Sequence, residues 1–194
     1  KSGSGKSYAT KTILSHLSAE NCKIFILDPE DEYSTLAKNV GGKVIDVGTA
    51  IQGRINPFHV ITTLESDEEG IVNDFSVHLQ FLEQFFHEIL PGIDPQALEY
   101  LNNLIVDLYA STKINSSTDF SKLKAKDYPI FDDLYDLINT RLSKAKVDYD
   151  VNNLRILLNF VSKFAHEGRD SNLWNGESKL TVKENFTVFN FRSL

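Results

Sequence analysis

The first seven residues hold the pattern in this chain that is most able to do chemistry. They are Lys1-Ser2-Gly3-Ser4-Gly5-Lys6-Ser7, the end of the G-x-x-x-x-G-K-[ST] pattern with its first Gly one position before residue 1. Glycines at positions 3 and 5 let a loop curve around a phosphate with its backbone N–H groups pointing inward and without a clash at Cβ. The pattern predicts a P-loop that binds the phosphates of a nucleotide.

Each part of this loop has an expected role. Lys6 would reach the β- and γ-phosphate oxygens, and Ser7 would place its hydroxyl on Mg²⁺. The helix that Ser7 opens would aim the positive end of its dipole at the anion. The expected nucleotide-binding residues are Gly3, Ser4, Gly5, Lys6, Ser7 and Tyr8, with Ser7 as the metal ligand.

A flexible Gly/Ser linker is the plain alternative, because Ser-Gly-Ser-Gly is typical of one. Two observations favour the P-loop. The Lys-Ser pair stands at the required position, and residues 8–19 carry Ile13, Leu14 and Leu17 at helical spacing with no Gly or Pro. An apolar run over residues 24–28, typical of a buried strand, then ends in Asp28.

Acidic residues follow this strand, in the sequence Asp-Pro-Glu-Asp-Glu-Tyr at positions 28–33. Carboxylates there can simply offset the dipole of a following helix. Alternatively, Glu30 or Glu32, at the carboxyl end of a strand near the P-loop, faces the nucleotide or the attacking water. We do not assign Asp28 as the Walker B acid, because a further unit usually precedes that strand. We expect the Mg²⁺-organising carboxylate beyond Leu194, since no other run of four apolar residues ends in Asp-Asp or Asp-Glu.

The elements around these residues predict an α/β architecture at both ends of the chain and helices between them. A short helix that ends at Gly41 and Gly42, a strand over 43–47 and a returning strand over 187–191 belong to the α/β part. Apolar residues recur at helical spacing over 71–89, 98–108, 131–142 and 151–164, and residues 113–127 have the composition of a solvent loop. The 71–89 helix carries a second apolar stripe, Val77, Phe81 and Phe85, which we expect neighbours to enclose rather than leave as a groove for a partner.

Composition and charge exclude several classes of protein. The 194 residues include 41% hydrophobic residues and one Cys, which predicts a soluble domain with a real core and no internal disulfide framework. No stretch approaches the roughly 18 apolar residues of a membrane span. The five histidines show no metal-ligand spacing. A net charge of −7 argues against broad gripping of nucleic-acid backbone, so any DNA contact would be local.

Several elements coincide in order and approximate spacing with one known family. They are the Ser-Gly-Ser-Gly-Lys-Ser loop, Asp28-Pro29-Glu30-Asp31-Glu32-Tyr33, Leu36-Ala37 before Gly41-Gly42, Ile55-Asn56-Pro57-Phe58, Pro129-Ile130-Phe131-Asp132-Asp133-Leu134, Leu158 through Gly168, Leu173-Trp174-Asn175-Gly176, and Val188-Phe189-Asn190-Phe191. With these residues the chain resembles the C-terminal ATPase domain of conjugative type IV secretion ATPases, the TraC/TraE-like members of the HerA/FtsK superfamily. The resemblance covers nearly the whole chain.

The resemblance implies a RecA-like α/β P-loop ATPase core, incomplete in this chain, with an all-helical insertion. The implied division is residues 1–58 for the P-loop and first α/β units, 59–168 for the insertion, and 169–194 for the return to the core sheet. The implied activity is hydrolysis of ATP with Mg²⁺ in the full-length protein, with Lys6, Glu30 and Glu32 as catalytic residues. The family's Walker B acids and later arginine have no counterpart here, so we expect this chain alone to be inactive.

The resemblance also implies partners and a location. Family members form homo-oligomers, work with other secretion-system subunits at the cytoplasmic face of the membrane, and energise transfer-apparatus assembly and the transfer of DNA or protein. Direct contact with DNA is left open. The alternatives are a DNA-pumping or coupling ATPase of the same superfamily, which strongly basic pore loops would favour, and a non-catalytic nucleotide-binding assembly module.

Overall fold

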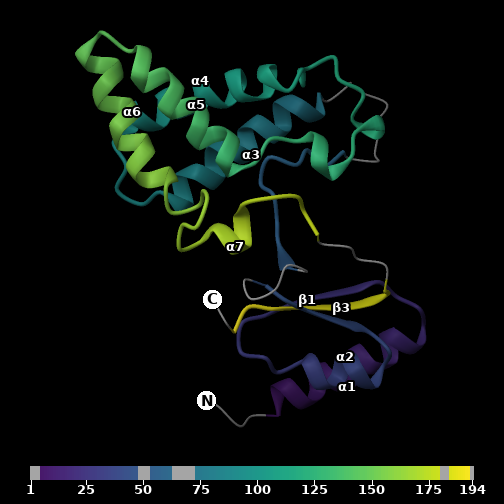
Figure 1. Cartoon of the computed structure of the whole chain (residues 1–194). Helices are drawn as coiled ribbons and strands as arrows, with labels where there is room; N and C mark the ends of the chain where they lie inside the picture. The colour runs from purple at the N-terminus through teal and green to yellow at the C-terminus, as the bar shows by residue number, and fades with distance from the viewer. Residues whose placement is uncertain (1–4, 48–52, 63–72, 180–183, 193–194) are drawn as a thin grey trace. The chain divides into compact units, whose positions relative to one another are not determined.

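The computed structural model describes residues 5–47, 53–62, 73–179 and 184–192. The chain divides into two compact units (Figure 1). Unit 1 consists of residues 1–54 and 179–194, and unit 2 consists of residues 55–178. The expected α/β elements lie in unit 1 and the expected helices in unit 2.

Unit 1 is built around a small parallel sheet. Its elements are α1 (Lys6–Ala19), β1 (Ile24–Asp28), α2 (Ser34–Asn39), β2 (Lys43–Asp46) and β3 (Phe186–Asn190). The strand order is β1-β3-β2, and β3 runs parallel to both neighbours. The returning strand expected near residue 187 therefore exists, and it lies between two strands from the other end of the chain. This central strand is buried, with Val188 and Thr187 both fully shielded from solvent, as parallel strands commonly are.

Helices α1 and α2 lie on the same face of this sheet (Figure 1). Ile24, Ala37 and Val188 form the centre of the small core, and Leu14 of α1 packs against it. The turn between α2 and β2 needs a residue without a side chain, because a Cβ on Gly42 would lie 2.5 Å from the backbone oxygen of Phe186. This close approach explains the second glycine of the pair that ends α2.

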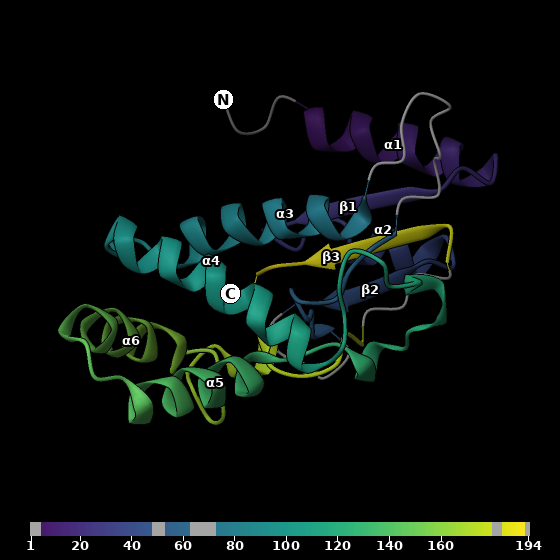
Figure 2. The same ribbon diagram turned by 90° about the horizontal axis from the view of Figure 1, so that it is seen from above.

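The regular elements of unit 2 within its described residues, 55–62 and 73–178, are all helices. Its helices are α3 (Asp74–Ile89), α4 (Pro95–Ser111), α5 (Phe131–Lys144), α6 (Asp148–Val161) and α7 (Ser171–Trp174). Helices α5 and α6 lie side by side, and α4 packs against both (Figure 2). The predicted solvent loop 113–127 contains two 3₁₀ helices, η2 (Phe120–Lys122) and η3 (Ala125–Asp127). No helix of the described ranges has the length and apolar character to cross a membrane.

The core of unit 2 is aromatic and centres on Phe58 of the Asn-Pro-Phe sequence. The fully buried Phe58 ring lies 5.1 Å from the Phe131 ring and 6.1 Å from the Phe86 ring, measured between centroids. Asn56 fixes this segment, because its Nδ2 donates to the Pro129 carbonyl oxygen at 2.8 Å and its Oδ1 accepts from the Phe58 N–H at 3.1 Å. Residues 55–58 and 169–178, which the sequence analysis grouped with the ATPase core, thus belong to the helical unit.

The two apolar stripes of α3 have different surroundings. Phe75, Leu82 and Phe86 of the first stripe are buried, as expected, whereas Ile71 lies outside the described residues. In the second stripe, Phe85 is partly buried and packs edge-on against Trp174, with ring centroids 5.1 Å apart. Val77 and Phe81 are 45% and 50% exposed, so the expectation that neighbours enclose this stripe is wrong at both positions. Helical periodicity identifies apolar faces, but it does not say how many of them find a neighbour.

Candidate nucleotide-binding site

The first turn of α1 is open and suited to an anion. Gly5 precedes the helix with a φ of 72°, a left-handed conformation that glycine adopts without strain, and a Cβ there would meet no atom within 4 Å. No side-chain hydrogen bond caps the described turn, and the turn contains no acidic residue. The first N–H groups of a helix have no partner within it, so those at the start of α1 can bind phosphate oxygens.

Four of the six expected nucleotide-binding residues come together in this turn. Gly5, Lys6, Ser7 and Tyr8 are all exposed there, whereas Gly3 and Ser4 lie outside the described residues. The Lys6 ammonium and the Ser7 hydroxyl fit the groups they would hold, since an ammonium suits phosphate oxygens and a hydroxyl oxygen suits the hard ion Mg²⁺. The assignment of these residues to nucleotide and metal stays a prediction.

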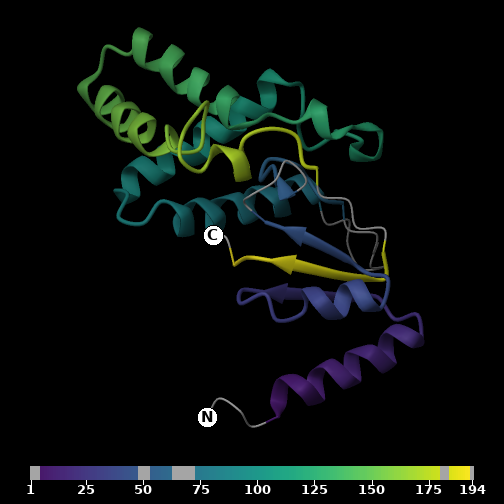
Figure 3. The ribbon, with the colours of Figure 1, turned by 60° about the horizontal axis from the view of Figure 1, so that its bottom comes forward.

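The start of α1 lies on the same side of unit 1 as the carboxyl ends of the strands (Figure 3). There Asp28, Asn190 and Asp46 end β1, β3 and β2 in register. Asn190 donates from Nδ2 to Oδ1 of Asp46 at 3.0 Å and accepts the Arg192 N–H at 3.0 Å. Of these three residues, only Asp28 was predicted from the sequence to end a strand as a polar residue. The same signal, a polar residue directly after an apolar run, would also have found Asp46 and Asn190.

Asp28 holds the loop that follows β1. Its side chain is only 2% exposed, and its Oδ1 accepts the Glu32 N–H at 3.0 Å while its Oδ2 accepts the Tyr33 N–H at 2.8 Å. A carboxylate with both oxygens bound to backbone amides acts as a cap for the turn. That the Walker B acid lies elsewhere stays a prediction.

Glu30 and Glu32 lie on this loop with exposed side chains. Within the described part of the chain, neither carboxylate forms a hydrogen bond or an ion pair. A cation–π contact joins the loop to α1, because Nζ of Lys11 lies 5.4 Å from the centroid of the Tyr33 ring. This loop leaves β1 at its carboxyl end, on the side of unit 1 where α1 also begins (Figure 3). That either glutamate faces a nucleotide stays a prediction.

Comparison with known proteins agrees with this geometry. The family model described as the central domain of helicase HerA matches residues 1–191. The chain belongs to this HerA family. No curated protein sequence matches it.

A solved structure extends the assignment of this HerA-family domain. VirB4 of Thermoanaerobacter pseudethanolicus superimposes with a TM-score of 0.88 and 25% sequence identity, over 100% of this chain and 49% of the VirB4 chain. The HerA-family domain thus spans about half the length of that protein. It is a VirB4-like ATPase domain of the HerA/FtsK superfamily, in which an α/β core with a parallel sheet carries a helical unit.

Proposed function

We propose that the protein containing this domain is the ATP-hydrolysing motor of a type IV secretion system. The observation that supports this proposal most is the open first turn of α1, with Lys6 and Ser7 exposed beside the carboxyl edge of the sheet. It stands within a chain that resembles VirB4 over its whole length. The substrate class is a nucleoside triphosphate, because the turn offers backbone N–H groups and an ammonium to an extended polyphosphate.

The residues divide the work of phosphoryl transfer. Gly3, Ser4 and Gly5 surround the phosphates with backbone N–H groups, and Lys6 compensates the charge of the β- and γ-phosphates. Ser7 would be the protein's ligand to Mg²⁺, and the ion, when bound, would neutralise charge on the phosphates. Glu30 or Glu32 orients the attacking water. Such positioning and charge compensation supply most of the catalysis in this reaction class.

The motor would act in an assembly. We propose that the whole protein forms a homo-oligomer, works with other secretion-system subunits at the cytoplasmic face of the membrane, and energises assembly of the apparatus and transfer of DNA or protein during conjugation. The likeness to VirB4 supports this role. The net charge of −7 favours it over a DNA-pumping ATPase that grips nucleic-acid backbone directly.

Steady-state phosphate release by the whole purified protein tests the proposal. We expect release that saturates with ATP and disappears when EDTA removes Mg²⁺. Nucleotide binding without turnover, in the presence of the other subunits as well as alone, would instead identify a non-catalytic assembly module. Absence of any nucleotide binding would reject both functions.

A further inference from the structure

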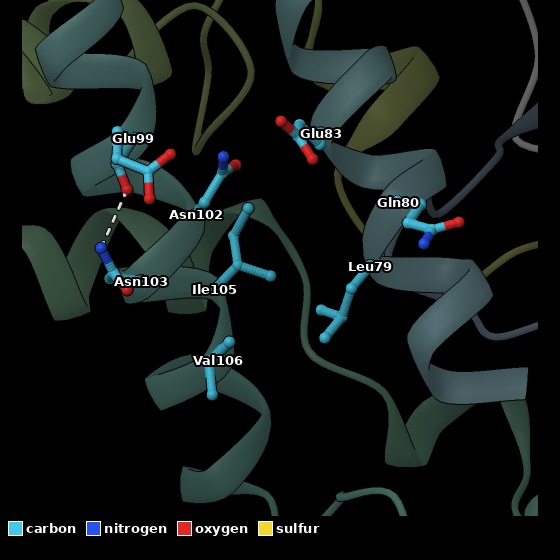
Figure 4. A pocket seen from close by; sticks show the side chains of 8 residues that line it. All are labelled: Leu79, Gln80, Glu83, Glu99, Asn102, Asn103, Ile105 and Val106. Carbon is cyan, nitrogen blue, oxygen red and sulfur yellow. Dashed lines mark hydrogen bonds between the residues drawn. The ribbon is translucent and has the colours of Figure 1, made fainter. Parts of the chain in front are cut away.

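A groove runs between α3 and α4 on the helical unit (Figure 4). Leu79, Ile105 and Val106 supply its apolar surface, while Glu83 of α3 and Glu99 of α4 stand on opposite sides. The hollow has a volume of about 280 Å³. It continues along α3 into a second hollow of about 500 Å³, because Gln80 and Glu83 line both.

The charge of this region is strongly one-sided. Residues 55–112 contain ten Asp and Glu and no Lys or Arg, whereas the rest of the chain has 17 Asp and Glu against 20 Lys and Arg. The net negative charge of the chain therefore comes entirely from this segment. Its described carboxylates on α3, on α4 and between them are Asp74, Glu83, Glu88, Asp94, Glu99 and Asp107.

Two of these carboxylates, Glu83 and Glu99, line the groove, and within the described ranges their side chains form no ion pair or hydrogen bond. Glu88 has only the exposed His87 ring, at 3.6 Å. Like charges gathered along one groove repel each other, and an approaching cation relieves that repulsion. The same field repels the phosphates of nucleic acids and of anionic lipids.

We propose that the α3–α4 groove is a docking site for a basic amphipathic helix of a partner protein. Lys or Arg side chains spaced one turn apart would pair with Glu83 and Glu99, and an apolar side chain between them would contact Leu79, Ile105 and Val106. Val106 is 48% exposed and available for this contact. A helix is the fitting occupant, because residues 79–88 of α3 and 98–106 of α4 line the two hollows, and a groove between two helices offers an elongated track.

The proposal is independent of ATP hydrolysis and is tested by fluorescence anisotropy. The probe is a labelled synthetic helical peptide of about 18 residues, long enough to be helical when bound, with a stripe of Leu that has Lys on both sides of it. We expect Glu83→Lys/Glu99→Lys to weaken binding at least about tenfold, since truncating or reversing paired charges typically has effects of that size. Val106→Asp should also weaken it, because it adds charge to the apolar surface.

Matched controls decide the result. Glu20→Lys/Glu167→Lys makes the same change in net charge at exposed sites outside the groove and should change affinity by less than about twofold. A scrambled peptide of equal composition should bind more weakly than the amphipathic one. Equal losses in both double variants, or equal binding of both peptides, would show only general attraction and overturn the proposal. Self-association of the wild type that Glu83→Lys/Glu99→Lys abolishes would overturn it in favour of a second copy of the chain.

Discussion

Three carboxylates near the end of β1 differ in what surrounds them. Asp28 is buried and binds two backbone amides, while Glu30 and Glu32 are exposed and have no side-chain partner among the described residues. A buried carboxylate whose oxygens both accept hydrogen bonds stabilises the local fold, whereas an exposed carboxylate can still bind or polarise a ligand. Structural and chemical roles are therefore divided between neighbours in one short loop.

Replacement of Asp28 should affect stability. Asp28→Ala leaves the N–H groups of Glu32 and Tyr33 without their acceptors, so we expect a loss of about 1–3 kcal/mol in the free energy of unfolding. Urea denaturation measures this loss. A wild-type midpoint in Asp28→Ala would mean that the loop does not depend on this cap.

Replacement of the glutamates should affect turnover and not stability. We expect that Glu30→Gln or Glu32→Gln lowers the kcat for ATP of the whole protein at least about tenfold, because an uncharged amide orients and polarises the attacking water less strongly than a carboxylate does. The melting temperature should not change, since both side chains are exposed. Full activity in both variants would remove these residues from the catalytic set.

At the scale of elements, one close approach of two backbones lies where β2 and β3 begin. Strand β3 lies between β1 and β2, and Gly42 allows the backbone before β2 to reach Phe186 at the start of β3. A side chain at this position would push the two strands apart.

Gly42→Ala should therefore destabilise unit 1. Its Cβ would lie 2.5 Å from the Phe186 oxygen, and relief of such overpacking typically costs about 1–3 kcal/mol. Gly41→Ala is the matched control, because Gly41 has a φ of 71° but no atom within 4 Å of a Cβ, so only backbone strain of about 1 kcal/mol applies. A smaller loss of unfolding free energy for Gly42→Ala than for Gly41→Ala would contradict this account of the turn.

A buried hydrogen-bond chain joins α3, α4 and residues 55–62. The Tyr109 hydroxyl donates to the Phe58 carbonyl oxygen at 2.6 Å and lies 2.9 Å from Nε2 of His78. Because the single hydroxyl proton goes to Phe58, Nε2 of a neutral His78 is the donor of the second bond. The pKa of His78 is lowered to about 4, mainly by burial and also by the nearby His59, and a hydrogen bond with the Phe58 backbone opposes the shift.

The lowered pKa of His78 predicts a pH-dependent stability. The folded state disfavours the protonated ring. The stability that the neutral His78 ring contributes is therefore fully present above the ordinary pKa of 6.5 and is lost as the pH falls from 6.5 toward 4. The loss amounts to at most about 3 kcal/mol. His78→Gln, whose amide can still donate to Tyr109, should show a smaller loss of unfolding free energy between pH 7 and pH 4 than the wild type. Equal losses in the two proteins would place the pH dependence on other groups.

At the scale of the whole molecule, local patterns predicted the elements but not their partners. Helical spacing located α1, α3 and α4, and Asp94 caps α4 by accepting the Gln96 N–H. The place of β3 in the sheet depends on pairing between residues more than 140 positions apart, such as Asp46 and Asn190. No local pattern contains that information.

For the candidate nucleotide-binding site too, local sequence patterns predicted some features but not those that depend on distant contacts. The phosphate-binding turn follows from residue types alone, because its chemistry lies in consecutive residues. The structural role of Asp28 and the burial of the Asn56-Pro57-Phe58 segment in the helical unit depend on which distant groups surround them. The apolar stripe that contains Val77 and Phe81 was found from the sequence, but its spacing does not reveal that these two side chains stay exposed.

The central claim is that the first turn of α1 holds the phosphates of ATP through Lys6. The most direct test is steady-state phosphate release by the whole protein with Lys6→Ala, beside Lys38→Ala as a control at an exposed lysine of α2. We predict that Lys6→Ala lowers turnover at least about a hundredfold, the effect typical of losing one group that stabilises transition-state charge. Circular dichroism and melting temperature should match the wild type, because Lys6 is exposed. Unchanged turnover in a correctly folded Lys6→Ala protein would contradict the account.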